Sequence, residues 1–146
     1  MIVNDVLMAL NARFHISYKT LETIHNETTI PIQANQLHEV IAVLQEELRI
    51  YHLTTITAQM PANTPEIILV YYHFWHQKGF TFAIQLPIDD PQLPSIVDLT
   101  PGADFYEREV AEMFGVRFTG REETPPLLLP DDWDEEPPMR RKETAQ

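Results

Sequence analysis

Two stretches of the sequence carry side chains that often bind metal ions. His73 and His76 lie three residues apart in a segment rich in β-branched and aromatic residues, which predicts a strand. Residues three apart on a strand point to opposite faces of the sheet, so the two imidazoles are not expected to share an ion. The acidic run 131–136 lacks the central glycine and the correctly spaced closing glutamate of a calcium loop. We therefore expect ordinary strand histidines, a solvated acidic segment and no metal site.

A group of charged side chains shares one predicted helix, residues 104–114. Asp104 and Glu112 each lie four residues from Arg108, so both carboxylates are expected to pair with it along the helix surface. Glu107 is the unusual carboxylate of the set, because helical geometry places it beside the apolar side of the helix. That apolar side is formed by Tyr106, Val110, Met113 and Phe114.

No set of residues has the spacing of a familiar catalytic site. Glu107 and Glu109 diverge on a helix, and neither Ser17 nor Ser95 has neighbours that would activate a nucleophile. The four glycines are too scattered for a phosphate loop, and the absence of cysteine excludes thiol catalysis, disulfides and cysteine-ligated clusters. The residues alone predict an interaction protein. A free-standing soluble enzyme, with a pocket that the sequence does not reveal, is the alternative.

Composition and charge narrow the function classes further. The 146 residues have the size of one ordinary domain, and 44% of them are hydrophobic. A net charge of −12 disfavours free binding to nucleic acid and direct docking on anionic lipid. No apolar run approaches the roughly 18 residues of a membrane helix, and no secretory leader pattern is seen. We expect no direct membrane insertion, so that any contact with a membrane is made through a partner.

Hydrophobic periodicity predicts three helices and several strands in a single α+β domain. The sheet is expected to be mixed, dominated by antiparallel pairs and flanked by the helices, with residues 66–76 and 79–88 paired as a hairpin. Asn35 is the expected N-cap of the second helix, and Gly115 the glycine that ends the third. The predicted helices are residues 3–14, 36–50 and 104–114, and the predicted strands are residues 20–33, 52–60, 66–76, 79–88 and 95–99.

The composition changes after Gly120. Residues 121–146 contain five prolines, which exclude a long helix or a central strand. The same segment carries Leu127–Leu129, Trp133 and Met139, which are too apolar for a solvated linker. We therefore predict a core domain, residues 1–120, and an extended docking arm, residues 121–146, whose spaced apolar side chains bind along a partner's surface.

One stretch is much more specific than the rest. From Pro94 the chain runs P-S-I-V-D-L-T-P-G-A-D-F-Y-E-R-E-V-A-E-M-F-G-V-R-F-T-G. This block resembles the signature of the C subunit of respiratory NADH:quinone oxidoreductase (complex I), a family that includes the small subunit of membrane-bound energy-converting [NiFe] hydrogenases. The residues that carry the resemblance are Pro94, Ser95, Ala103, Tyr106, Glu107, Arg108, Glu109, Met113, Phe114, Gly115, Phe118 and Gly120.

The resemblance continues into the arm, with departures: the arginines that usually precede the tail are absent and Thr124-Pro125-Pro126 stand there, and the tail motif has Met139 and Arg141 where other residues are commoner. The stretches L-L-L-P-D-D-W (127–133) and P-M-R-R-K (138–142) look like the family's tail. After Gly120 the family normally has histidine and proline, whereas this chain has Arg121-Glu122. In the arm, the residues that the resemblance assigns to the subunit interface are Leu128, Trp133, Arg140, Arg141 and Lys142.

The resemblance implies a role inside a larger complex. A chain of this family binds no cofactor itself, whereas its parent complex holds NADH or ferredoxin, FMN, iron–sulfur clusters and quinone. Its expected partners are the large quinone-site subunit, or the [NiFe] large subunit, and the small iron–sulfur subunit, on the cytoplasmic side of the cell membrane. The resemblance also implies that partner or loop donors hold Glu107 at the subunit junction, so that Glu107→Ala would harm assembly more than folding.

Overall fold

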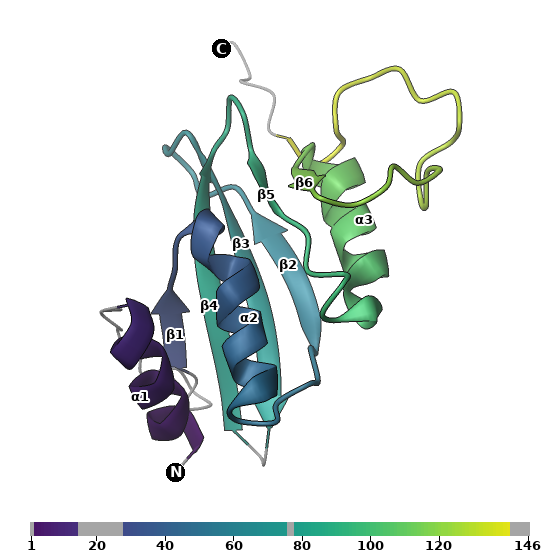
Figure 1. The fold of residues 1–146 in the computed structure, drawn as a ribbon. Helices are drawn as coiled ribbons and strands as arrows, with labels where there is room; N and C mark the ends of the chain where they lie inside the picture. Colours follow the sequence, from purple (N-terminus) through teal and green to yellow (C-terminus); the bar gives the residue numbers. More distant parts are fainter. Residues whose placement is uncertain (1, 15–27, 76–77, 141–146) are drawn as a thin grey trace.

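The fold is built on a four-stranded mixed sheet (Figure 1). The computed structural model describes residues 2–14, 28–75 and 78–140. The strand order is β1-β4-β3-β2, in which β1 runs parallel to β4 and the other neighbours are antiparallel. The strands are β1 (Thr28–Pro31), β2 (Thr55–Gln59), β3 (Glu66–Trp75) and β4 (Lys78–Pro87). The predicted hairpin is confirmed by the β3–β4 register, which closes at Trp75 and Lys78.

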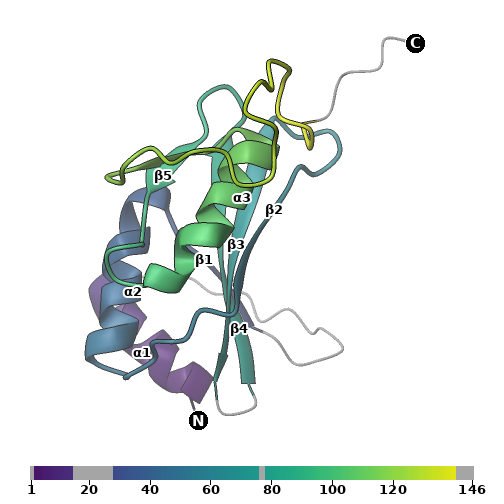
Figure 2. The ribbon, with the colours of Figure 1, turned by 90° about the vertical axis from the view of Figure 1, so that its right-hand side faces the viewer.

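All three α-helices lie on one side of this sheet (Figure 2). The helices α1 (Ile2–Phe14) and α2 (Leu37–Glu46) cover its face, and α3 (Asp104–Phe114) packs against β2. The short 3-10 helices η1 (Ala34–Gln36) and η2 (Pro101–Ala103) lead into α2 and α3. A second, two-stranded parallel sheet joins β5 (Gln92–Pro94) to β6 (Arg117–Thr119) and flanks α3. The predicted α+β class is therefore confirmed.

The core forms between the helical layer and the sheet face that it covers. Alternate strand residues point inward, as the period of two in a strand requires, and apolar residues of α2 and α1 meet them. The fully or almost fully buried residues include Ile56, Ile67, Leu69, Tyr71, Phe80, Phe82 and Ile84 of the sheet, Val40, Ile41, Val43 and Leu44 of α2, and Val6 and Leu10 of α1.

Two predicted boundaries are wrong at the second helix. Asn35 does not cap α2. It lies inside η1, where the Gln36 side chain accepts a hydrogen bond from the Gln33 N–H at 2.9 Å. The helix also ends at Glu46 instead of residue 50, because Arg49 takes a left-handed conformation (φ 57°) and Ile50 N–H bonds back to Leu44 O. This is a helix ending that glycine usually signals, and no glycine stands here.

The predicted strand 95–99 is also wrong. The strand of this region is β5, which ends at Pro94, and the chain then turns, with Leu99 and Thr100 N–H both bonded to Ile96 O. Of the predicted strand 20–33, only Thr28–Pro31 is seen as a strand, and residues 20–27 lie outside the described residues. His76, the second histidine of the spaced pair, also lies outside them.

His73 is buried beneath the helical layer, among aromatic side chains of β4. Its side chain is 3% exposed, its ring stacks on Phe80 at 5.2 Å between centroids, and Phe82 meets it edge-on. Its Nδ1 has no hydrogen-bond partner. Burial of the ring lowers the pKa of His73 from 6.5 to about 4, because the charged imidazolium would lose its hydration there.

We expect this histidine to make the fold sensitive to acid. The folded-state pKa lies below the unfolded value, so the stabilisation is complete above about pH 6.5 and is lost as the pH falls toward about 4. The loss amounts to roughly 3 kcal/mol. Urea unfolding between pH 7 and pH 4 should show a shallower dependence of stability on pH for His73→Gln than for the natural chain. Asn11→Gln, at an exposed and uncharged position of α1, is the control, and equal slopes for both variants would contradict this assignment.

Candidate functional site

The residues of the family signature gather on and around α3. The helix carries Asp104 and Glu107 in its first turn, where carboxylates favour the positive end of the helix dipole. It ends at Gly115, whose φ of 71° is the left-handed conformation that glycine adopts without strain. The predicted helix 104–114 and its glycine terminator are both confirmed. The helix therefore sets the direction of each charged side chain on it.

Glu107 lies at the centre of this region and has no exposed surface. Its Oε2 accepts hydrogen bonds from Ser95 Oγ at 2.7 Å and from Arg121 Nη1 at 2.9 Å. Its Oε1 accepts the backbone N–H of Ile96 at 2.8 Å. Three donors therefore hold a carboxylate that would otherwise be very costly to bury. Two of them belong to the turn that directly follows β5, so Glu107 fastens that turn to α3.

Arg121 is the counter-ion that the sequence did not reveal. It stands where this chain departs from the family pattern, and its guanidinium bridges Glu107 and Asp104. Its side chain is 14% exposed. Burial lowers the pKa of Arg121, but the hydrogen bonds to Asp104 and Glu107 outweigh that effect and raise it above its ordinary value. The first residue of the predicted arm is thus anchored in the core.

These contacts change the expectation for Glu107. The resemblance implied donors from a partner or a loop, and the structure supplies them from loops of this chain. No partner can touch a side chain that has no exposed surface. The damage from Glu107→Ala should therefore fall first on folding of the chain, contrary to the expectation that assembly would suffer more.

The arm lies along α3, and Glu112 holds its first part. The Glu112 carboxylate accepts the backbone N–H groups of three successive residues, Leu127, Leu128 and Leu129. Partial burial raises the pKa of Glu112, but these three hydrogen bonds outweigh it and lower the pKa. Glu112 was expected to pair with Arg108. It bonds the arm instead, because three backbone donors in a row match both carboxylate oxygens.

Arg108 contacts both the helix and the arm. Its Nη1 lies 3.6 Å from Asp104, as the helical spacing predicted, and its Nη2 donates to Pro125 O at 3.0 Å. Its charge also lowers the pKa of the neighbouring Glu112 carboxylate. Arg108 and Glu112, two residues of one helix, therefore bind the beginning of the arm together.

A second attachment lies at the end of α3. Met139 N–H donates to Met113 O at 2.8 Å, and Arg140 Nε donates to Phe114 O at 2.8 Å. A Cβ on Gly115 would come within 2.9 Å of Pro137, so glycine is needed there for close approach as well as for its φ. Arg140 thus satisfies a carbonyl at the end of α3. Arg141 and Lys142 lie outside the described residues.

Between its two attachments the arm projects away from α3 as an open loop (Figures 1 and 2). Leu128 is 56% exposed, Trp133 39% and Met139 55%, which is unusual for side chains of this size. The acidic residues at 131, 132, 134, 135 and 136 are all exposed as well. The arm therefore presents apolar and acidic groups outward while its backbone is held by α3.

The remaining signature residues support this arrangement. Phe118 is buried, Tyr106, Met113 and Phe114 are half-buried, and Glu109 is exposed. Gly120 has a φ of 80°, which turns the chain from β6 into the arm. The carboxylates of Glu107 and Glu112 bind residues of the arm, so both already accept hydrogen bonds from the protein. The arrangement is therefore built to hold two segments of chain, and within the described residues no group of three metal-binding side chains is found.

None of the helices among the described residues is both long enough and apolar enough to cross a bilayer.

Comparison with known proteins places the chain in one family. The family model described as respiratory-chain NADH dehydrogenase, 30 Kd subunit, matches residues 30–146. The C subunit of the NADH-quinone oxidoreductase of Acidothermus cellulolyticus is 30% identical over 141 residues, covering 92% of this chain and 73% of that protein. The C subunit of the F(420)H(2) dehydrogenase of Methanosarcina mazei is 30% identical over 112 residues, covering 75% and 71%. Two other NADH-quinone oxidoreductase relatives are longer, and this chain spans 47% and 58% of them.

A solved structure supports the fold. A chain in the membrane-bound sulfane sulfur reductase (MBS), an archaeal respiratory membrane complex, superposes with a TM-score of 0.73 at 23% identity, covering 89% of this chain and 77% of that chain. The signature block, the fold and the family match therefore agree: the chain belongs to the family of the 30 kDa subunit of respiratory-chain NADH dehydrogenase.

Proposed function

We propose that this chain is a peripheral, non-catalytic subunit of a membrane-bound respiratory oxidoreductase of the complex I type, and that its arm docks on the large quinone-site subunit. The observation that carries the proposal is that the arm combines a fixed backbone with exposed apolar side chains. Its backbone is fixed to α3 at both ends, through Glu112 and Arg140, while Leu128, Trp133 and Met139 stay exposed. Exposed apolar side chains on an ordered segment are what a partner surface buries.

Preorganisation strengthens this proposal. A disordered tail would have to lose its conformational entropy at the moment of binding, which weakens association. Here α3 already fixes the backbone on either side of the projecting loop. Burying one large apolar side chain in a partner contributes about 1.5–3 kcal/mol, so three such anchors could hold the arm in place.

The cofactor proposal follows from the residue types. The chain has no cysteine, so it has no thiolate for an iron–sulfur cluster. We propose that NADH or ferredoxin, FMN, iron–sulfur clusters and quinone are held by other subunits, including a small iron–sulfur subunit. We also propose that the chain lies on the cytoplasmic side of the membrane, attached through those subunits.

A second candidate function is the equivalent subunit of an energy-converting [NiFe] hydrogenase or a related complex. Two observations favour this second candidate. Arg121-Glu122 replaces the histidine and proline usual in the complex I signature, and one 30% identical relative belongs to an F(420)H(2) dehydrogenase. The chemistry of the large subunit separates the two possibilities.

Native isolation of the tagged full chain from its source membrane, followed by mass spectrometry, tests the proposal. We expect a large subunit of the quinone-site type to co-purify in equal amount with the chain. A large subunit with two CxxC pairs would instead assign the chain to a hydrogenase. Recovery of the chain alone, in a mild detergent that keeps the other subunits together, would contradict the docking role.

A further inference from the structure

The helix α3 lies at the surface of the molecule, with the arm passing over it (Figure 2). At about 100° per residue, Phe105, Arg108, Glu109 and Glu112 fall on one side of the helix, opposite the buried Glu107. Phe105 is 61% exposed, whereas every other large apolar side chain of α3 is buried or half-buried. Packing within the chain therefore does not account for a phenylalanine at this position.

Arg108 holds the ring of Phe105 in place. The guanidinium carbon of Arg108 lies 5.8 Å from the centroid of the ring, within the range of a cation–π contact. The same guanidinium donates to Pro125 O at 3.0 Å and lies 3.6 Å from the Asp104 carboxylate, so the ring is tied to both the helix and the beginning of the arm. An aromatic ring that is oriented before binding loses little conformational entropy, which favours its use as an interface anchor.

The exposed ring and the arm form one surface. Glu112 follows Arg108 by one turn of α3, and its Oε2 accepts the Leu128 N–H at 2.8 Å. Phe105, Arg108, Glu112 and Leu128 therefore form a continuous row, which we call the outer row, and each member interacts with the next. The two charges in the middle of the row already have partners within the chain. The exposed groups that they leave for a neighbouring molecule are the apolar side chains of Phe105 and Leu128.

Exposed carboxylates border the outer row. Glu109 lies one turn after Phe105 on the same helix, and Glu122 and Glu123 lie in the chain just before the arm reaches α3. Arg121, beside them in the sequence, is already bound to two carboxylates of α3. The border of the outer row is therefore acidic, in keeping with the net charge of −12.

We propose that Phe105 and Leu128 enter one apolar surface of the partner that receives the arm, and that lysine or arginine side chains border this surface. The inference rests on the proposed function, since it takes the partner of the arm as the occupant of the outer row. Protein interfaces combine an apolar centre with a polar rim, and charges of opposite sign across the rim speed association. A second copy of the chain is disfavoured as the occupant, because it would bring a second acidic border.

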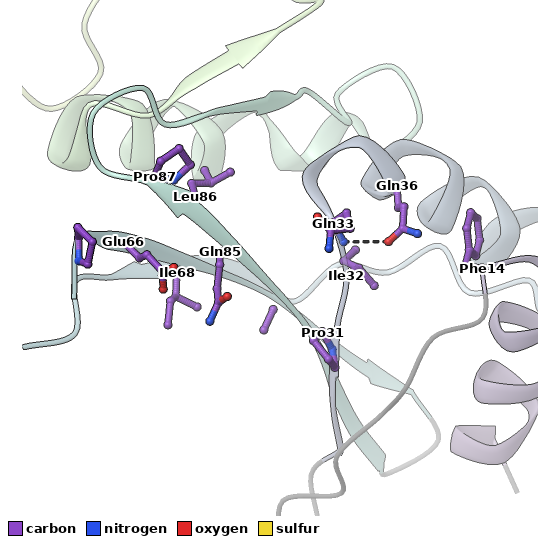
Figure 3. Close-up of a pocket in the computed structure, with 12 residues that line it drawn as sticks. Phe14, Pro31, Ile32, Gln33, Gln36, Glu66, Ile68, Gln85, Leu86 and Pro87 are labelled. Atoms are coloured by element: carbon purple, nitrogen blue, oxygen red, sulfur yellow. Dashed lines mark hydrogen bonds between the residues drawn. The ribbon is translucent and has the colours of Figure 1, made fainter. Parts of the chain in front are cut away.

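A hollow of about 720 Å³ lies on other elements (Figure 3). Pro31, Ile68 and Gln85 line it, from β1, β3 and β4, and none of its lining residues in the described part of the chain belongs to α3 or the arm. Because this hollow is not continuous with the arm, substitutions near it serve as controls for the outer row.

Phe105→Ala in the full chain tests the aromatic anchor. We expect the isolated variant to melt within about 2 °C of the natural chain, because the side chain is exposed and alanine favours a helix. The partner recovered by native isolation from the source membrane should fall about tenfold or more, since the interface loses an aromatic anchor. Phe74→Ala is the matched control, because Phe74 is exposed and alternates on β3 with the buried His73, so it points away from the helices. Phe74→Ala should recover the partner normally, and so should Gln85→Lys at the hollow.

A pair of variants at Glu109 tests the charge of the partner. Glu109→Lys reverses an exposed charge beside the outer row, whereas Glu109→Gln only removes it. A basic border on the partner predicts that Glu109→Lys recovers about threefold less partner than Glu109→Gln at low salt. The difference should shrink as the salt concentration rises, because salt screens exposed charges. Equal recovery by the two variants at low salt would contradict the basic border.

Recovery of the partner by Phe105→Ala at the natural level would overturn the proposal, and so would an equal loss for Phe74→Ala or Gln85→Lys. A dimer of the isolated natural chain that Phe105→Ala dissociates would also overturn it, because the occupant would then be a second copy. If Phe105→Ala melts lower, the Glu109 pair decides, since both of its variants keep the ring. Failure of the natural chain to recover any partner would count against the proposed function, whereas equal recovery by the natural chain and Phe105→Ala would count against the outer row alone.

Discussion

Replacement of Glu107 by alanine should be the most damaging single change in the signature. It would leave Ser95 Oγ and the Ile96 N–H buried without an acceptor, and it would remove one of the two carboxylates that face Arg121. Breaking a buried ion pair with its hydrogen bonds costs about 3–5 kcal/mol. Urea unfolding of the isolated chain at neutral pH measures this loss. Glu109→Ala, an exposed carboxylate on the same helix, is the matched control and should stay within about 0.5 kcal/mol of the natural chain.

A double-mutant cycle separates the ion pair from the other bonds of Glu107. Glu107→Gln keeps the shape of the side chain and an acceptor oxygen but removes the charge that faces Arg121. With Arg121→Gln as the second change, the coupling energy between the two positions should reach about 1–3 kcal/mol. Strict additivity of the two losses would show that Arg121 does not stabilise Glu107. Equal losses for Glu107→Ala and Glu109→Ala would contradict the role of the buried cluster as a whole.

Local signals explain which parts of the fold the sequence predicted. The helix α3 has a continuous apolar side and ends at a glycine, and both features act within a few residues of each other. The hairpin β3–β4 follows from two strand-forming runs joined by a short turn. The strand 95–99 was wrong because β5 is short and pairs with β6, far along the chain, through contacts such as Leu93 with Phe118. Periodicity within one segment cannot reveal such a distant partner.

The partners of Glu107 and Glu112 could not be predicted for the same reason: they lie far away in the sequence. Helical geometry identified Glu107 as the unusual carboxylate, because a charge beside an apolar face requires donors. Its cation, Arg121, gave no signal in the sequence except as a departure from the family pattern. Glu112 shows the converse case: a residue four away offered a ready ion pair, but the backbone N–H groups of residues 127–129 bind it in the folded chain. Long-range contacts decided both outcomes.

The stability of a truncated chain should depend on whether the cut removes Arg121. The division after Gly120 stays a prediction, and Arg121 lies just beyond it while bridging two carboxylates of α3. A chain that ends after Gly120 loses that cation and leaves Glu107 buried without a counter-charge. A chain that ends after Thr124 keeps Arg121. It gives up the contacts of Arg108 and Glu112 with the arm, and the hydrogen bonds of Met139 and Arg140 to the end of α3.

We therefore expect the two truncated chains to differ sharply in stability. The chain that ends after Thr124 should melt within a few degrees of the full chain, because hydrogen bonds near the surface contribute about 1 kcal/mol each and water replaces them. The chain that ends after Gly120 should lose about 3 kcal/mol more, the cost of a buried carboxylate without its cation. Thermal unfolding of both, beside the full chain, makes the comparison, and equal melting temperatures would contradict the role given to Arg121.

The chain that ends after Thr124 also tests whether the arm is the docking element. The chain that ends after Thr124 lacks Leu128, Trp133 and Met139, so it should fail to co-purify with its large partner even though it is folded. Recovery of the partner in the amount seen with the full chain would show that the arm is not the docking element. Unfolding of this chain would show instead that the arm belongs to the core. Because the cut leaves Arg121 in place, a loss of partner without a loss of fold can be assigned to the exposed side chains of the arm, and not to the buried cluster beneath it.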